Sequence, residues 1–179
     1  MEPYIPAHLP LRCLDFGQLI GLVGEANAAL ARYDGMLHGV VNPAILLSPL
    51  TTQEAVLSSR IEGTQATLDE VLEHEAGRSF EPYKTQDIAE VVNYRRALVL
   101  ASEALHDRAL TLGLVKQMHA VLLDSVRGQH KEPGRFRKDQ NWIGPAECAI
   151  EQATFIPPSP LQMLDHLEAW ETYIRGADV

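Results

Sequence analysis

The sequence predicts a mainly α-helical fold, a helical bundle with one small β-hairpin. Its composition favours helices over a β-sandwich, because 46% of the 179 residues are hydrophobic, only 6% are aromatic, and Ala and Leu dominate the apolar set. Capping residues also stand before segments whose apolar residues recur at helical spacing. The β-like runs are residues 141–144 and 153–156, and the segment 145–152 between them fits a hairpin with a long tip.

The N-terminal part is expected to be an extended arm followed by a helix. Three prolines within residues 1–14 exclude a helix there. Asp15 can cap the next segment, which is expected to end before Gly35. Asn42-Pro43 marks another helix start, which Pro49 is expected to interrupt. The apolar residues on or near one face of the first helix are Leu19, Ile20, Val23, Leu30 and Tyr33.

Two capping boxes predict the next helices. Thr51-x-x-Glu54 is the first box, and it predicts a helix that runs to about Ile61. Gly63 is expected to stop this helix, because glycine adopts the left-handed conformation that follows many helix ends. Thr67-x-x-Glu70 is the second box, and it predicts a short helix that closes at Gly77.

The second half of the chain is expected to alternate long helices with one irregular region. Thr85 starts a long helix with a broad apolar side, and a further helix is expected over residues 112–126. Residues 127–139 are polar, basic and rich in turn formers, which predicts a loop. After the hairpin, Ser159-Pro160 predicts the start of a last helix that Gly176 closes.

Charge and composition argue against several classes of function. The 15 Lys and Arg residues and 24 Asp and Glu residues give a formal net charge of −9, which argues against nucleic-acid binding through phosphate neutralisation. No apolar stretch reaches the roughly 18 residues that a membrane span needs, and the N-terminus lacks the features of a signal peptide. Cys13 and Cys148 have no metal-site or redox spacing, so we expect free thiols, no metal site and a cytoplasmic protein.

Two stretches carry more information than the rest. Residues 58–63, SSRIEG, end a predicted helix with a glutamate, which the negative end of the helix dipole slightly disfavours. The second stretch is the basic loop PGRFRKDQ, which leads into the hairpin text NWIG and leaves it through FIPPSP. An open hairpin edge can accept a strand from a partner. From the residues alone, a solvated helix end and a solvated hairpin packed on helices remain open interpretations.

In their order and spacing, SSRIEG, QNWIG and FIPPSP resemble the Fic family, whose members mostly transfer AMP from ATP to a protein hydroxyl group. SSRIEG fits the inhibitory-helix pattern of that family, and the segment MHAVLL at residues 118–123 fits its core. The resemblance covers nearly the whole chain. It implies an N-terminal region over residues 1–110, with the inhibitory helix near 51–62. It also implies the first part of the Fic core over residues 111–179, with a flap hairpin at about 141–156.

The resemblance assigns an inhibitory role to three residues. Glu62 is the inhibitory glutamate, Ser58 lies one helical turn earlier and is expected to hold it in place, and Gly63 permits a sharp turn after it. In the family, this carboxylate pairs with the last arginine of the catalytic loop. It thereby intrudes where the γ-phosphate of ATP must sit.

The resemblance also assigns a target-docking flap. Main-chain hydrogen bonds along the hairpin would align the target segment. Ile143 is the expected clamp side chain, whereas Trp142 and Phe155 are expected to anchor the hairpin to the helices. The residues assigned to the flap are Asn141, Trp142, Ile143, Gly144, Phe155 and Ile156.

The sequence departs from the family pattern in one decisive respect. It contains no HPFx(D/E)GNGR motif, so we assign no catalytic residue and expect a chain truncated before that motif and inactive alone. ATP and Mg²⁺ are implied for the complete enzyme, but neither is expected to bind this chain tightly. The apolar faces of residues 112–126 and 160–174 are expected to be partly uncovered. The implied partners are a protein substrate, the chain itself included, and a second copy in a homodimer.

Two other functions stay open. The chain can be a stand-alone regulatory or interaction protein that offers its inhibitory glutamate in trans, because some Fic proteins take the inhibitory helix from a separate small partner. It can also be the catalytically dead product of a truncated gene, in which the resemblance is inherited scaffold. In the first alternative Glu62 is again the candidate residue, whereas the second has no functional site.

Overall fold

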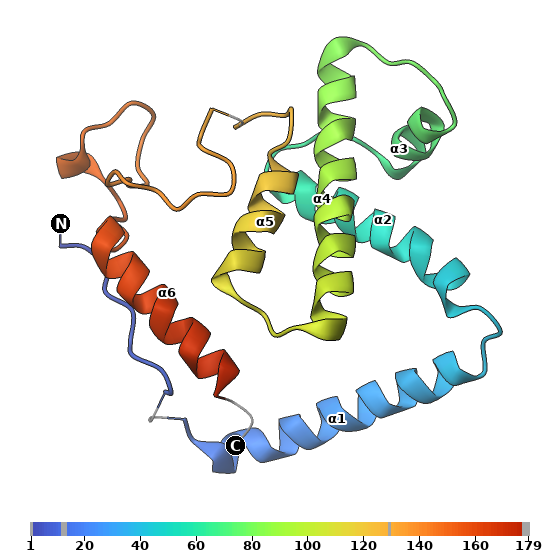
Figure 1. Cartoon of the computed structure of the whole chain (residues 1–179), viewed down its shortest axis with the longest axis horizontal. Helices are drawn as coiled ribbons and strands as arrows, with labels where there is room; N and C mark the ends of the chain where they lie inside the picture. The colour runs from blue at the N-terminus through green and yellow to red at the C-terminus, as the bar shows by residue number, and fades with distance from the viewer. Residues whose placement is uncertain (1, 12–13, 129, 177–179) are drawn as a thin grey trace.

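The computed structural model describes residues 2–11, 14–128 and 130–176, and within them it confirms the predicted mainly helical fold (Figure 1). The helices are α1 (Phe16–His38), α2 (Pro43–Ile61), α3 (Leu68–Glu75), α4 (Pro82–Asp107), α5 (Leu112–Leu122) and α6 (Pro160–Arg175), and a single 3-10 turn covers Ile150–Gln152. The predicted hairpin is reduced to one antiparallel bridge between Ile143 and Phe155.

The core lies where α2, α3 and α4 meet. In Figure 1, α4 stands upright beside α5, and α2 and α3 contact its other side. Small and β-branched side chains let these helices approach closely, which suits a compact contact between α2 and α4. The buried residues of this cluster are Ala55, Val56, Ala66, Val71, Ile88 and Val91. The core therefore sits directly beneath the C-terminal end of α2, which carries Glu62.

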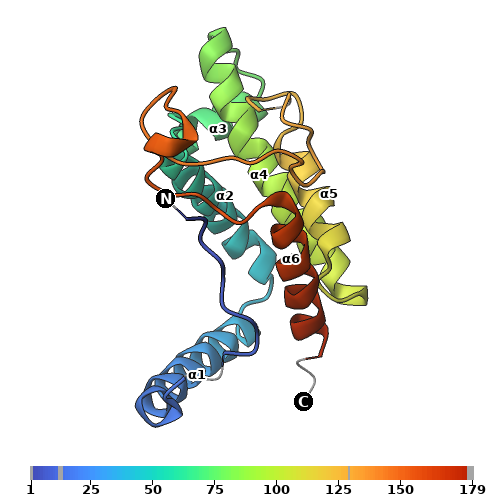
Figure 2. The same cartoon turned by 90° about the vertical axis from the view of Figure 1, so that its left-hand side faces the viewer.

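Helix α1 lies apart from this core. It extends along the bottom of Figure 1 and has no substantial contact with any other helix in the part of the chain that the structure describes. None of its residues is buried, although several large apolar side chains lie along it. The most exposed of these are Phe16, Ile20, Leu22, Leu30 and Met36. The packed unit of the fold is therefore α2–α5, with α1 as a projecting element (Figure 2).

The prediction that α2 begins at Thr51 is wrong. The helix begins at Pro43 and continues through Pro49, so Thr51 lies inside it and the Thr51-x-x-Glu54 capping box does not form. An internal proline removes one backbone donor, which normally ends a helix. Here the later turns of α2 are held against α4 by buried residues such as Ala55. Tertiary packing thus overrides the local stop signal.

Three other helix boundaries also differ from the predictions. Gly35 lies inside α1, which continues to His38 and ends at Gly39. Helix α4 begins at Pro82 rather than at Thr85, whose hydroxyl instead donates to the Phe80 carbonyl at 3.2 Å. Helix α5 ends at Leu122 rather than at Val126. The caps predicted at Asp15, Thr67 and Ser159 are confirmed, the last two as complete capping boxes.

The early end of α5 has a tertiary cause. The buried Asn93 side chain on α4 donates to the Asp124 carbonyl at 2.7 Å and lies 3.5 Å from the Leu122 carbonyl. These contacts take up carbonyl groups at the end of the helix, which otherwise lack partners. The chain turns after Leu123 and brings Arg127 to the face of α4.

Candidate functional site

Glu62 lies at the C-terminal cap of α2, where the chain turns sharply. The amide of Gly63 donates to the Arg60 carbonyl at 3.0 Å, and the amide of Thr64 donates to the Ser59 carbonyl at 3.2 Å. These two bonds form a Schellman motif, which requires a left-handed residue between them. Gly63 provides that residue with a φ of +96°. The turn predicted at Gly63 is therefore present, and it ends the helix immediately after Glu62.

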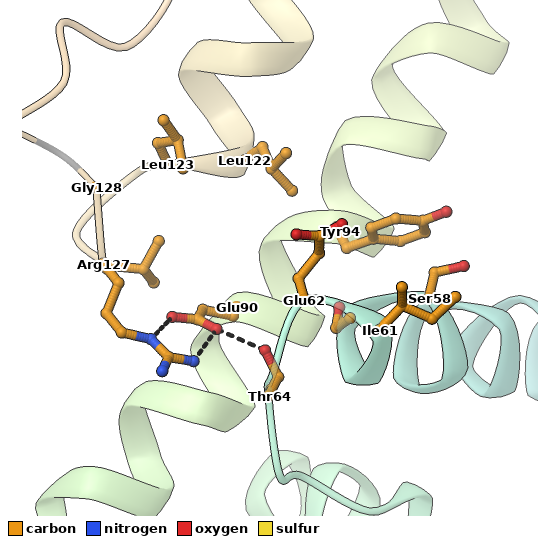
Figure 3. Close-up of a pocket in the computed structure, with 12 residues that line it drawn as sticks. Ser58, Ile61, Glu62, Thr64, Glu90, Tyr94, Leu122, Leu123, Arg127 and Gly128 are labelled. Carbon is orange, nitrogen blue, oxygen red and sulfur yellow. Dashed lines mark hydrogen bonds and ion pairs between the residues drawn. The ribbon is translucent and has the colours of Figure 1, made fainter. Parts of the chain in front are cut away.

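Ser58 does not hold Glu62 in this structure. Its hydroxyl donates to the Glu54 carboxylate at 2.6 Å, one turn earlier in α2. Glu62 has already left the helical path, so the spacing that brings residues four apart together no longer applies to it. Within the described residues, the Glu62 carboxylate makes no hydrogen bond or ion pair, and Figure 3 shows it pointing into the adjacent cavity.

The cavity beside Glu62 is large, open and mainly apolar. Its volume is about 820 Å³, and it lies between the end of α2, the face of α4 and the end of α5 (Figure 3). Its apolar lining comes chiefly from Ile61, Tyr94, Leu122, Leu123 and Val126. An unpaired carboxylate at the rim of an apolar cavity is suited to a cationic group carried by an apolar segment.

A network of charged groups closes one side of this cavity. The Arg127 guanidinium donates from Nε to Glu90 Oε1 and from Nη2 to Glu90 Oε2, both at 2.6 Å, and Nη2 also reaches Asp87 Oδ1 at 3.2 Å. The Thr64 hydroxyl donates to Glu90 Oε2 at 2.6 Å. The network therefore joins three parts of the chain: the segment after α2, helix α4 and the turn after α5 (Figure 3).

The electrostatics of the network favour the ionised carboxylate. Hydrogen bonds from Arg127 lower the pKa of Glu90 below its ordinary value of 4.5, and the Thr64 hydroxyl adds to this effect against the opposing influence of burial. The hydrogen bonds to Glu90 raise the pKa of Arg127 in turn. Both groups are therefore charged at neutral pH, and each stabilises the charge of the other.

Acid should weaken this network, and the contribution of Glu90 to the loss of stability can be measured separately. Because its folded pKa lies below the unfolded value, Glu90 contributes stability that is present above about pH 4.5 and lost as the pH falls through the folded pKa. We expect Glu90→Gln to reduce the difference in urea unfolding free energy between pH 7 and pH 3.5 by about 1 kcal/mol, since Arg127 is half exposed.

The remaining acid sensitivity in that experiment should come from other carboxylates. Burial raises the pKa of Glu70, but hydrogen bonds from Lys84 and Thr67 outweigh it and leave the pKa lowered. Glu70→Gln is therefore the matched variant, and the two effects should add because the residues share no partner. An unchanged pH dependence in Glu90→Gln would show that the Arg127 pair does not persist in solution.

The flap residues lie elsewhere, because no residue of 141–156 lines the cavity beside Glu62. The Ile143 amide donates to the Phe155 carbonyl at 2.9 Å, and the Phe155 amide donates to the Ile143 carbonyl at 3.1 Å. In this pairing, the main-chain groups of Trp142 and Gly144 face away from the second run. Within the described residues they make no main-chain hydrogen bond. An edge for an added strand is therefore available, and the Ile143 side chain beside it is 64% exposed.

One of the expected flap roles is wrong. Ile156 is buried, and its carbonyl accepts a hydrogen bond from the Tyr4 amide at 2.8 Å, so it belongs to the packing beneath the flap rather than to a docking surface. Trp142 donates from its indole nitrogen to the Cys148 carbonyl at 3.0 Å, which ties it to the tip of the flap, and its expected anchoring to the helices stays a prediction. Phe155 lies against Tyr4, with ring centroids 6.0 Å apart.

Gly144 has a packing role at the tip of the flap. A Cβ atom there would lie 2.6 Å from the Cys148 sulfur and 3.3 Å from Ala153 Cα, so a larger residue would require the Cys148 side chain to move. Cys148 itself is a half-buried free thiol. The other cysteine, Cys13, lies outside the described residues.

A second cavity lies between the N-terminal arm, α5 and α6. Its volume is about 640 Å³, and its lining includes Leu112, Val115, Met163, Leu167 and Trp170. His8 of the arm stacks on His166 of α6 at 5.2 Å between ring centroids. Helix α6 has no buried residue, so its apolar face and that of α5 are partly open, as the sequence predicts.

Neither a metal site nor a membrane-spanning helix is found among the described residues. Among the described residues, no group of three or more His, Cys, Asp or Glu side chains is arranged to hold a metal ion. None of the described helices combines the length and apolar character needed to cross a bilayer.

Sequence reasoning singled out Glu62 and the flap as candidates, which stay predictions, and it did not include the charged network. Asp87 and Glu90 are three residues apart on α4, a spacing that places them on one helix face. This spacing of Asp87 and Glu90 can be recognised in the sequence. Their partner Arg127 is 37 residues from Glu90, and only the fold brings the two together.

Comparison with known proteins adds one match. Residues 20–103 match the family model described as Fic/DOC family N-terminal. The matched segment contains most of α1, all of α2 and α3, and most of α4, and so includes Glu62, Thr64 and Glu90. Arg127 and the flap lie outside it. The comparison with curated proteins found no match for the chain.

Proposed function

Because the chain belongs to the Fic/DOC family through residues 20–103, its N-terminal region, we propose that it is the regulatory and target-docking part of a protein adenylyltransferase. In this proposal the complete enzyme transfers AMP from ATP to a protein hydroxyl group. Glu62 inhibits the transfer, and the edge at Trp142 and Gly144 docks the target. The observation that carries the proposal is the unpaired Glu62 carboxylate, which points into an open cavity from the end of the SSRIEG helix.

The inhibitory chemistry follows from charge. A carboxylate at this position can accept two hydrogen bonds from a guanidinium group of a catalytic segment placed in the cavity. The same negative charge repels the γ-phosphate of ATP. A nucleotide that enters beside Glu62 is thereby kept out of the pose needed for in-line attack at its α-phosphate. Inhibition in this form needs no movement of the core.

The cavity itself does not suit ATP. Its lining includes the Glu62 and Glu90 carboxylates, and its single guanidinium among the described lining residues, that of Arg127, is already paired with Glu90 and Asp87. A triphosphate would meet repulsion there rather than free donors. In the proposal, ATP and Mg²⁺ therefore bind to a segment that carries the HPFx(D/E)GNGR motif, and this chain supplies the charge that controls them.

Docking of the target uses the flap edge. A target strand beside residues 142–144 can pair with the main-chain groups of Trp142 and Gly144. The exposed Ile143 side chain beside that edge supplies an apolar contact. Main-chain pairing aligns a hydroxyl along the strand without reading much of the target sequence.

Complementation tests the proposal. The 179-residue chain is mixed with a separately produced polypeptide that carries the catalytic motif, and transfer of label from α-labelled ATP to protein is measured. We expect a stable complex, with labelling that a Gly144→Pro chain fails to support because the edge is distorted. Absence of both complex and labelling would contradict the proposal.

A second function is favoured by the same unpaired carboxylate. The chain can present Glu62 in trans to another enzyme of the family and so act as its inhibitor. In that case, addition of the chain to an enzyme whose own inhibitory glutamate has been removed should suppress its AMP transfer, and Glu62→Gly should abolish the suppression. No change in transfer on addition of the chain would remove this alternative.

A further inference from the structure

We propose that Arg127 is a positioning residue for Glu62, acting through Glu90 and Thr64. These three residues form what we term the latch, which fixes the segment after α2 and so sets where the Glu62 carboxylate points. The inference rests on the proposed inhibitory function of Glu62 and adds how that site is held. It also assigns a role to the turn after α5, which lies outside the matched N-terminal region.

No side-chain hydrogen bond or ion pair within the described residues holds Glu62 in place. Glu62 and Gly63 are both exposed, their amides donate only to the preceding helical turn, and the Gly63 carbonyl accepts from the Gln65 side chain at 3.4 Å. The nearest buried residues are Ser59 before them and Thr64 after them, at 8% and 2% exposure. The direction of the Glu62 side chain is therefore set by how these two neighbours are held.

The segment after Glu62 is held by contacts with helix α4, which is distant in the sequence. The Thr64 hydroxyl donates to Glu90, 26 residues away, and the Gln65 amide donates to Asp87 Oδ2 at 2.8 Å. Two consecutive residues thus bind two carboxylates one turn apart on α4. Lys84 adds a bond from its ammonium group to the Gln65 carbonyl at 3.1 Å. Polar contacts therefore fix Thr64 and Gln65 to α4, next to the apolar packing of Ala66 in the core cluster.

The Asp87 and Glu90 carboxylates depend on the Arg127 guanidinium for charge compensation. The side chains of Asp87 and Glu90 are only 12% and 17% exposed, so two uncompensated negative charges there would be costly. Arg127 engages both oxygens of Glu90 and one of Asp87, which fixes the Glu90 carboxylate with Oε2 toward Thr64. Without the guanidinium, we expect Glu90 to turn toward water and release the Thr64 hydroxyl.

Amide hydrogen exchange on the whole chain tests the latch directly. We expect Arg127→Met and Thr64→Val to speed exchange at residues 62–65 about tenfold, while the core of α4 around Ile88 and Val91 keeps its protection. Thr64→Ser retains the hydroxyl and should behave like the unaltered chain. Arg78→Met is the matched control, because it removes an equally close but exposed pair with Glu73 on the far side of α3.

Three outcomes would overturn the inference. Unchanged exchange at residues 62–65 in Arg127→Met would show that the latch does not hold this segment. Equal acceleration at residues 62–65 and in the core of α4 would show that Arg127 only stabilises the fold. Thr64→Ser exchanging as fast as Thr64→Val would likewise exclude the hydroxyl as the link.

AMP transfer in the complemented protein separates the latch from the proposed function. We expect Arg127→Met to raise transfer in the unaltered background and to add nothing in Glu62→Gly, since both act through one carboxylate. If Glu62→Gly itself leaves transfer unchanged, the proposed function fails, and the exchange experiment still decides on the latch. An increase from Arg127→Met that is equally large in the Glu62→Gly background would contradict positioning of Glu62.

Discussion

Glu62→Gly should raise AMP transfer in the complemented protein by at least about tenfold. In the proposed function, the substitution removes the charge that would pair with a guanidinium of the catalytic segment and repel the γ-phosphate. A hydrogen bond between charged groups contributes about 1.5 to 3 kcal/mol, and each 1.4 kcal/mol changes a rate by about tenfold. Since the Glu62 carboxylate makes no hydrogen bond or ion pair within the described residues, its removal should leave the fold of α2 intact. Labelling from α-labelled ATP measures the effect.

Two further variants make this result specific to the Glu62 charge. Glu62→Gln keeps the size of the side chain and can still accept a hydrogen bond, so it should activate less than glycine does. Glu73→Gln removes an exposed carboxylate of α3 that lies outside the cavity and should leave transfer unchanged. Equal transfer in Glu62→Gly and the unaltered chain would exclude an inhibitory role for this residue.

Ile88→Ala should cause the largest loss of stability, about 2 to 5 kcal/mol. Ile88 is fully buried in the N-terminal part of α4, in the cluster formed with α2 and α3. Truncation leaves a cavity between three helices that small residues already bring close together, so neighbouring side chains cannot fill it. Because natural domains are stable by only about 5 to 15 kcal/mol, the variant should approach unfolding. Urea titration followed by circular dichroism at pH 7 measures the change.

A milder substitution at Ile88 and a substitution at an exposed position serve as controls for the stability loss in Ile88→Ala. Ile88→Val should cost about 0.5 to 1.5 kcal/mol and remain folded, so the comparison stands even if Ile88→Ala does not fold. Val99→Ala lies on the same helix at 48% exposure and should change stability by less than about 0.5 kcal/mol. Similar losses at Ile88 and Val99 would show that the contact of α2, α3 and α4 is not the core.

Local signals in the sequence were sufficient where one residue determines a helix end. The caps at Asp15, Thr67 and Ser159 and the stop at Gly63 depend on side-chain and backbone chemistry within a few residues, and all four are present. Glu62 became a candidate because SSRIEG resembles the inhibitory-helix pattern of the Fic family, which spans six residues of a single helix end. Its inhibitory role stays a prediction.

Predictions failed where distant residues compete with a local signal. Thr51 carries a capping box, yet α2 starts eight residues earlier because its later turns pack on α4. Ser58 stands one turn before Glu62, yet its hydroxyl binds Glu54 because the chain has already turned. Arg127 could only be read as part of a basic loop, since its partners on α4 are 37 and 40 residues away.

The projecting helix α1 means that the chain does not have a single stability. Among the described residues, this helix of 23 residues has no substantial contact with another helix and relies mainly on its own hydrogen bonds, which leaves it near the balance point between helix and coil in water. The α2–α5 unit, in contrast, opens only at the expense of its buried cluster. Heat or denaturant therefore acts on two units with different midpoints, and one melting temperature describes the α2–α5 unit without describing α1.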